Sequence, residues 1–165
     1  MVYTLLKMKI RDTYLQKNYK ECNKKLTDLY REIIKDNQIN LIEQNQLIWY
    51  YYFYKSNILK KQKDFNNALS FCLKSFKFIY FKDEFNTEYK GTLYLLAKLY
   101  KELNEKQKAM KTYEYLLTIT KNEQYEVILE NISSLRQNSN IITFNKQNKN
   151  SNSNKENDFN FCCYF

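Results

Sequence analysis

The sequence predicts an all-α protein of stacked antiparallel helical hairpins, an α-solenoid with a C-terminal capping helix and a disordered tail. Three observations carry this prediction. Apolar residues recur at three- and four-residue spacing, the pattern of a helix with one buried face. Three polar breaks interrupt the pattern at intervals of 46 residues, from Cys22 to Ala68, and 41 residues, from Ala68 to Ala109. With 1 Gly and no Pro in 165 residues, the chain has almost none of the residues that usually form tight turns and separate strands.

The first hairpin is predicted around the break at residues 17–22. Asn18 is a favourable N-cap for the helix that follows. The apolar face of that helix comprises Leu26, Leu29, Tyr30 and Ile33. Cys22 lies on the same face, and we expect both it and Cys72 in the next unit to be small buried residues.

The second hairpin is predicted around residues 63–69, with Asp64 as the N-cap. The face of its second helix comprises Ala68, Leu69, Cys72, Phe76, Ile79 and Tyr80. These spacings of three and four residues gather the side chains on one side of a helix that reaches residue 80.

The third hairpin is predicted around residues 104–109, with Asn104 as the N-cap. The helix before this break is the best patterned in the chain, with Leu93, Leu96, Ala97, Tyr100 and Leu103 on one face. The helix after it carries Tyr113, Leu116 and Leu117. The same pattern of a helix, a short polar break and a second helix therefore occurs three times.

A seventh helix, about residues 123–136, is predicted to cap the stack. Its apolar positions are Tyr125, Ile128, Leu129, Ile132 and Leu135. The composition then becomes rich in Asn, which predicts a helical repeat domain over residues 1–138 and a disordered tail over residues 139–165. Cys162 stands fourth from the end, formally a prenylation box, although a chance match is the favoured interpretation.

The pattern resembles the tetratricopeptide repeat. Ala97 and Tyr100 look like the small residue and the aromatic of its first helix, and Ala109, Tyr113 and Leu116 look like the signature of its second helix. The resemblance covers roughly residues 2–136. The unit length of 41 to 46 residues exceeds the standard length of 34. Such longer units are similar to those of bacterial receptors for short signalling peptides. If the chain is related to such receptors, it is a truncated or partner-dependent member.

The resemblance also implies a groove for an extended peptide, lined by the first helix of each hairpin. The positions that correspond to it are Arg11, Tyr14, Tyr50, Phe53, Asn57, Lys60, Tyr94, Lys98 and Lys101. An Asn amide can donate to and accept from a peptide backbone, and Lys or Arg can bind a carboxylate. The competing interpretation is an ordinary solvated face, and the six consecutive aromatics at residues 49–54 cannot all face one way.

Composition excludes several kinds of catalytic site. Without His, the chain has no His general base, no Ser–His or Cys–His pair and no usual catalytic zinc site. With a single Gly it has no Gly-rich phosphate loop. We therefore expect a binding protein rather than an enzyme, with no metal and no cofactor.

The expected partner is a peptide or protein segment, with an acidic one favoured weakly by the net charge of +9. A nucleic acid is a less favoured alternative, because Lys and Glu alternate along the chain instead of clustering. A regulator that acts on a protein partner and an adaptor tethered to a membrane through Cys162 or Cys163 remain as further alternatives. Homo-oligomers are left open.

Targeting signals are not expected. Charged residues interrupt the N-terminal apolar stretch too early for a secretory signal, and the longest apolar run, residues 47–54, is too short for a transmembrane segment. Four Cys without a paired pattern fit a reducing cytoplasm.

Overall fold

The computed structural model describes residues 2–79, 87–120 and 124–144, and these segments form helices joined by short connections. The helices are α1 (Val2–Leu15), α2 (Tyr19–Lys35), α3 (Leu41–Lys61), α4 (Phe65–Ser75), α5 (Thr87–Glu102), α6 (Lys106–Thr118) and α7 (Gln124–Phe144), with a 3-10 helix η1 (Phe76–Phe78) after α4. The all-α prediction is confirmed for this part of the chain.

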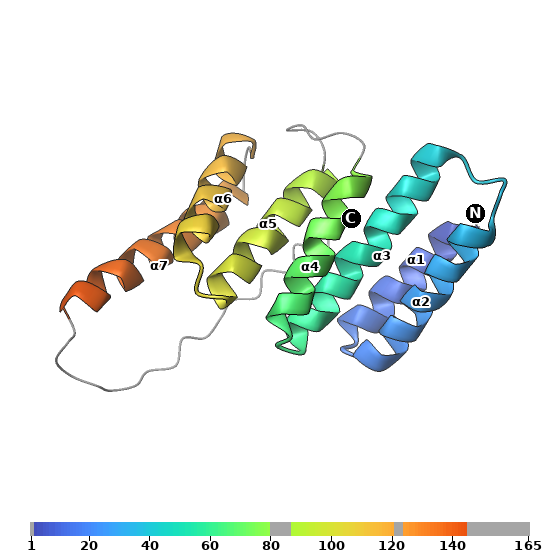
Figure 1. The fold of residues 1–165 in the computed structure, drawn as a ribbon, viewed down its shortest axis with the longest axis horizontal. Helices are drawn as coiled ribbons and strands as arrows, with labels where there is room; N and C mark the ends of the chain where they lie inside the picture. Colours follow the sequence, from blue (N-terminus) through green and yellow to red (C-terminus); the bar gives the residue numbers. More distant parts are fainter. Residues whose placement is uncertain (1, 80–86, 121–123, 145–165) are drawn as a thin grey trace.

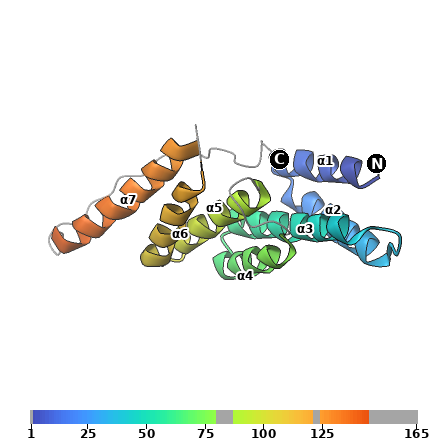
Figure 2. The ribbon, with the colours of Figure 1, turned by 90° about the horizontal axis from the view of Figure 1, so that it is seen from above.

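Every pair of consecutive α-helices from α1 to α7 packs together. In Figure 1 the helices follow one another across the molecule, from α1 and α2 at the right, through α3, α4 and α5, to α6 and α7 at the left. In the view from above, α3 lies between α1 and α4 (Figure 2). Within the described residues, no helix is both long enough and apolar enough to cross a bilayer.

The three predicted breaks form turns of the same geometry. Lys17, Lys63 and Asn104 adopt positive φ angles of 60°, 63° and 59°. In each turn the N–H of this residue donates to the carbonyl three residues earlier, and the next N–H donates to the carbonyl five residues earlier. This pair of bonds is the Schellman motif, which satisfies the last carbonyls of the preceding helix.

Two of the predicted N-caps are confirmed and one is wrong. The side chains of Asn18 and Asp64 accept from the backbone N–H of Glu21 at 3.2 Å and of Asn67 at 3.3 Å. In the third turn, the N-cap is Glu105, because Asn104 occupies the left-handed position one residue earlier. Asn tolerates that conformation better than most residues, so the turn gives it a backbone role in place of a capping role.

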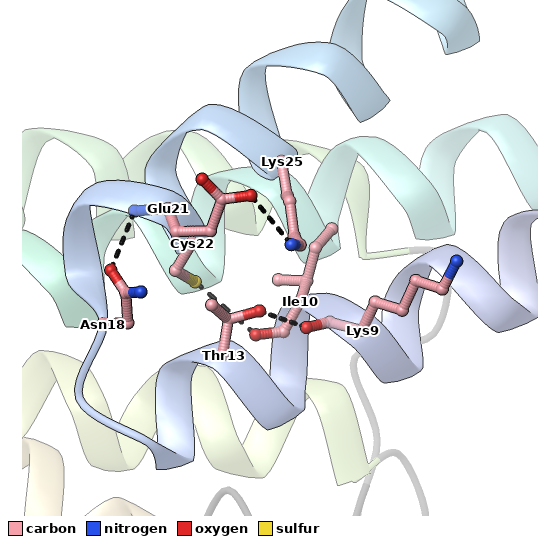
Figure 3. Close-up of polar contacts among 7 residues, drawn as sticks. All are labelled: Lys9, Ile10, Thr13, Asn18, Glu21, Cys22 and Lys25. Carbon is pink, nitrogen blue, oxygen red and sulfur yellow. Dashed lines mark hydrogen bonds and ion pairs between the residues drawn. The ribbon is translucent and has the colours of Figure 1, made fainter.

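The turns define a common register for the three hairpins. In each hairpin, the first-helix residue seven positions before the left-handed turn residue pairs with a second-helix residue that follows this first-helix residue by 12 positions. The pairs are Ile10 with Cys22, Ser56 with Ala68, and Ala97 with Ala109. All six are 0% exposed. The Cys22 thiol donates to the Ile10 carbonyl at 3.5 Å (Figure 3), and the Ser56 hydroxyl donates to the Ala68 carbonyl at 2.7 Å. The two helices of each hairpin therefore approach at equivalent points.

The described residues form two core clusters that meet at α5. The first core cluster runs from α1 to α5 and ends at Leu95, Leu96 and Leu99. The second core cluster runs from α5 to α7 and includes Ala97 and Tyr113. Neighbouring positions of α5 thus belong to different clusters, as expected for a helix between two others.

The predicted burial of two cysteines is confirmed. Cys22 and Cys72 are both free thiols at 0% exposure. Burial raises the pKa of Cys22 to about 12, and it raises the pKa of Cys72 as well. The buried thiols therefore stay protonated at neutral pH. Cys162 and Cys163 lie outside the described residues.

Helix ends differ from the prediction at two places. The second helix of the middle hairpin ends at Ser75 and continues only as η1, so Phe76 and Ile79 follow the α-helix instead of extending it; Tyr80 lies outside the described residues. At the other end of the chain, α7 continues to Phe144, so residues 139–144 of the predicted tail are helical, whereas residues 145–165 lie outside the described residues.

The predicted face of α7 is only partly buried. Ile128, Ile132 and Leu135 pack into the second core cluster, whereas Tyr125 is 43% exposed and Leu129 is 39% exposed. The exposed side of α7 also carries polar residues, including Glu130, Ser133, Arg136 and Gln137. The helix thus has one face that packs on α6 and another that is mostly polar.

Replacing Lys63 with glycine is expected to raise the free energy of unfolding by about 0.5–1 kcal/mol. A left-handed conformation costs a residue with a Cβ about 1–2 kcal/mol, and the greater freedom of glycine in the unfolded chain offsets part of the gain. Urea denaturation followed by circular dichroism would measure the change. Asn104→Gly is the matched control with a smaller gain, and a destabilised Lys63→Gly would contradict the assignment of strain to this turn.

Candidate ligand-binding site

The first helices of the three hairpins align several of the predicted groove residues. Arg11, Asn57 and Lys98 each follow the buried residue that defines the register, and each is half-buried. Lys60 and Lys101 occupy the next turn of α3 and α5 and are also half-buried. These polar side chains therefore recur at matching positions of α1, α3 and α5.

The aromatic members of the predicted groove are buried. Tyr14, Tyr50 and Phe53 belong to the first core cluster, and Tyr94 belongs to the second, with exposures of 5%, 9%, 3% and 4%. Lys98 covers the Tyr94 ring, with its Nζ 5.0 Å from the ring centroid. The rings therefore form the packed wall behind the polar positions rather than an open aromatic surface.

A cavity of about 370 Å³ lies where α1, α3 and the beginning of α5 meet. Its lining residues come from all three helices and are Thr4, Lys7, Met8, Arg11, Trp49, Tyr50, Thr87 and Glu88. The predicted groove residues Arg11 and Tyr50 are among them, whereas Asn57, Lys60, Lys98 and Lys101 lie further along their helices. The cavity thus coincides with one end of the predicted groove.

Hydrogen bonds fix the aromatic wall of this cavity. The Tyr50 hydroxyl donates to the Lys7 carbonyl at 2.8 Å, and the Lys7 Nζ lies 5.8 Å from the centroid of the same ring. Trp49 Nε1 donates to Thr92 Oγ1 at 2.9 Å, and Thr92 Oγ1 donates to the Glu88 carbonyl at 2.7 Å. These bonds tie α1 to α3 and α3 to α5, so a ligand would meet a largely preformed surface.

The charges of the cavity are of both signs. Lys7 and Arg11 supply two cations, and Glu88 supplies a carboxylate. Burial raises the pKa of Glu88, and the charge of Lys7 opposes that rise. Among the residues that the structure describes, the buried Nε of Arg11 has no hydrogen-bond partner, since the Asp12 carboxylate lies 3.9 Å away. This arrangement can accept a carboxylate beside Lys7 and Arg11, because a guanidinium with an unused donor gains a charge-assisted bond.

Neither a protein-family model nor a curated protein matches this chain. Within the described segments, no group of three or more Cys, Asp or Glu side chains is placed to hold a metal ion.

Sequence reasoning missed Lys7 and Glu88. Lys7 stands three residues before Ile10, the same offset that identified Phe53 from Ser56 and Tyr94 from Ala97, so the register of the later hairpins could have found it. Glu88 and Thr87 lie in the first turn of α5, ahead of the apolar pattern that defined this helix, and only the tertiary packing brings them to α1.

Replacing Glu88 with glutamine is expected to change how stability depends on pH. A carboxyl group with a raised pKa in the folded protein stabilises the fold below the unfolded value, near 4.5, and this contribution is lost as the pH rises through the folded pKa. Glu88→Gln should therefore gain stability relative to the parent chain as the pH increases above about 4.5. Urea denaturation of both proteins from pH 4 to pH 8 would measure this difference, and a constant difference would contradict the raised pKa.

Proposed function

We propose that this chain is a non-catalytic helical repeat module of the tetratricopeptide type that binds a peptide or protein segment along α1, α3 and α5. The three Schellman turns and the 12-residue pairing of buried residues support a repeated hairpin. A repeat of this kind gives successive first helices the same exposed positions, which suits a ligand that extends across them.

One observation carries the proposal. The cavity between α1, α3 and α5 combines two cations, one carboxylate and a rigid aromatic wall in about 370 Å³. An acidic side chain or a C-terminal carboxylate of a peptide fits the pair Lys7 and Arg11, and the same peptide can continue toward Asn57. The Asn57 Nδ2 donates to the Phe53 carbonyl at 3.0 Å, while its amide oxygen is of a type that accepts from a peptide N–H.

The direct test is selection from a random octapeptide library with free C-terminal carboxylates, in parallel with the same library amidated. Retained peptides should resist a wash at about 0.5 M salt, because a partly buried charge pair is screened much less than an exposed one. They should also be enriched in carboxylates. If neither library yields a retained peptide, the proposal is wrong.

Arg11→Gln should weaken binding of a selected peptide about tenfold or more, since a hydrogen bond between charged groups is lost. The matched control is Arg31→Gln, because Arg31 on α2 is 69% exposed and pairs with Asp28. Equal losses in the two variants would show that net charge, and not the cavity, governs binding.

Asn57→Ala should weaken the same peptide about threefold to tenfold with little change in melting temperature. The matched control is Asn131→Ala in α7, whose Nδ2 makes the same kind of bond, to the Val127 carbonyl at 2.7 Å. A large drop in melting temperature for Asn57→Ala would assign this residue a structural role.

Retention on single-stranded DNA distinguishes the nucleic-acid alternative. A binder of this class would lose affinity steeply with salt, with a slope that reports several phosphate contacts. If the chain binds DNA with such a slope and ignores the peptide libraries, the assignment as a peptide-binding module is wrong.

A further inference from the structure

The outward side of α1 carries apolar residues that the structure leaves exposed. Leu5 is 55% exposed, Met8 is 49% exposed and Leu15 is 40% exposed. Their spacing of three and seven residues places them along one face of the helix. Isolated apolar residues at a surface are normal, but the equivalent positions of the later first helices are buried or half-buried.

The common register shows that later helices bury these positions. Counting by 46 and then by 41 residues, Leu5 corresponds to Tyr51 and Thr92, and Met8 corresponds to Tyr54 and Leu95. Thr92, Tyr54 and Leu95 are 0%, 3% and 4% exposed, and Tyr51 is half-buried. The side of α1 that is exposed is therefore the side that is covered in α3 and in α5.

The preceding helix supplies the cover in both cases. On α3, the Tyr51 ring stacks on Tyr30 of α2 with ring centroids 4.5 Å apart. On α5, the thiol of Cys72 in α4 donates to the Thr92 carbonyl at 3.7 Å. The chain thus contains two examples of the kind of helix that packs on this face.

A lysine marks the same face on α1 and α3. Lys9 corresponds to Lys55, and the Lys55 Nζ donates to the side-chain oxygen of Asn23 in α2. Lys9 itself is exposed, and Figure 3 shows its side chain extending away from the contact between Ile10 and Cys22. A helix packed on α1 in the manner of α2 would bring a side-chain oxygen to the Lys9 ammonium.

Charge favours an acidic partner over a second copy of the chain. Lys9 and Asp12 lie on this face, whereas Lys7 and Arg11 line the cavity. The α1 helix still carries a net charge of +2 and the whole chain one of +9, which favours an acidic partner over a second copy. The helices that could cover α1 in a second copy, α2, α4 and α6, are each already packed against the helix that follows.

We propose that the face of α1 formed by Leu5, Met8 and Lys9 binds an amphipathic helix of a partner protein, packed as α2 packs on α3 and presenting a carboxylate to Lys9. This surface is distinct from the peptide site proposed above, although Met8 lies at the border of both. Its test therefore relies on Leu5 and Lys9, which do not line the cavity.

The probes are two labelled, acetylated and amidated peptides based on α2, residues 19–35. The parent peptide replaces the exposed Lys20, Lys24 and Lys35 with glutamate to make the helix acidic, and the second peptide also carries Asn23→Asp. In fluorescence anisotropy, the full chain should bind the Asn23→Asp peptide about fivefold or more tightly than the parent peptide, because the bond to Lys9 becomes charge-assisted. Lys9→Ala should abolish this preference.

Lys55→Ala is the matched control, because a peptide that displaced the chain's own α2 would couple to Lys55 and not to Lys9. The preference should survive Lys55→Ala. Leu5→Glu should weaken both peptides about tenfold or more, whereas Leu73→Glu, at a position of α4 that is 46% exposed, should leave them unchanged. Circular dichroism of each variant would verify the fold.

Three results would overturn the proposal: no binding of either peptide up to about 1 mM, equal binding by Leu5→Glu and the parent chain, or a preference that depends on Lys55 instead of Lys9. Lys9 and Leu5 are outside the cavity, so failure of the helix-binding proposal leaves the octapeptide selection unaffected. Failure of the octapeptide selection likewise leaves the helix-binding proposal standing.

Discussion

Replacing Trp49 with alanine is expected to lower the free energy of unfolding by about 3–5 kcal/mol, a large part of the stability of a domain of this size. Trp49 is 3% exposed, and its ring stacks on Phe53 with centroids 5.0 Å apart. Its Nε1 also makes the hydrogen bond to Thr92 that ties α3 to α5. Urea denaturation followed at 222 nm would measure the loss.

Two milder variants separate the hydrogen bond from the packing. Trp49→Phe and Thr92→Val each remove one partner of the bond, and a double-mutant cycle should give a coupling of about 1 kcal/mol. Trp49 also lines the cavity, so Trp49→Ala should weaken peptide binding as well as stability. A loss of less than about 1.5 kcal/mol on Trp49→Ala would contradict its placement as a fully packed link between α3 and α5.

Replacing Tyr113 with alanine should destabilise the chain by about 3–5 kcal/mol, but mainly in α6 and α7. Tyr113 is 0% exposed and lies in the second core cluster, which meets the first at α5 and at Phe76 of η1. Hydrogen exchange should show faster exchange over residues 106–144 while residues 2–79 stay protected. Uniform acceleration over the chain would instead show that the two clusters unfold as one unit.

The conservative control is Tyr113→Phe, which keeps the ring and removes the hydroxyl. That hydroxyl is buried without a hydrogen-bond partner in the part of the chain that the structure describes, and burial raises the pKa of the phenol. Tyr113→Phe is therefore expected to be neutral or stabilising by about 1 kcal/mol. A marked loss would show that the oxygen is satisfied in solution.

The repeated hairpins could be predicted because the polar breaks carry their own chemistry. Asn18 and Asp64 are residues whose short side chains accept from the first turn of a helix, and they do so here. Asn104 has the same chemistry but also tolerates a left-handed backbone, and the sequence does not tell which of the two properties a turn will use. The end of α4 at Ser75 was missed for a similar reason, since Phe76 fits the helical period but is the first residue of η1.

The candidate site could be predicted only in part. Arg11 and Tyr50 were found because a helical register locates the side of a helix that a residue occupies. Register does not tell how closely the next helix covers that side, so the burial of Phe53 and Tyr94 was not anticipated. Glu88 was missed because its place beside Lys7 depends on how α5 meets α1 across the row of helices, a contact between residues far apart in the sequence.

The three left-handed turns have a consequence for how such a chain can change length. The segment from Lys17 to Lys63, or from Lys63 to Asn104, begins and ends at the same backbone geometry, so an in-frame duplication or deletion between two of these points would join existing turns without creating a new junction. A single recombination event of this kind adds or removes one second helix together with the first helix that follows it, so the number of hairpins changes by one and each joint keeps the left-handed turn.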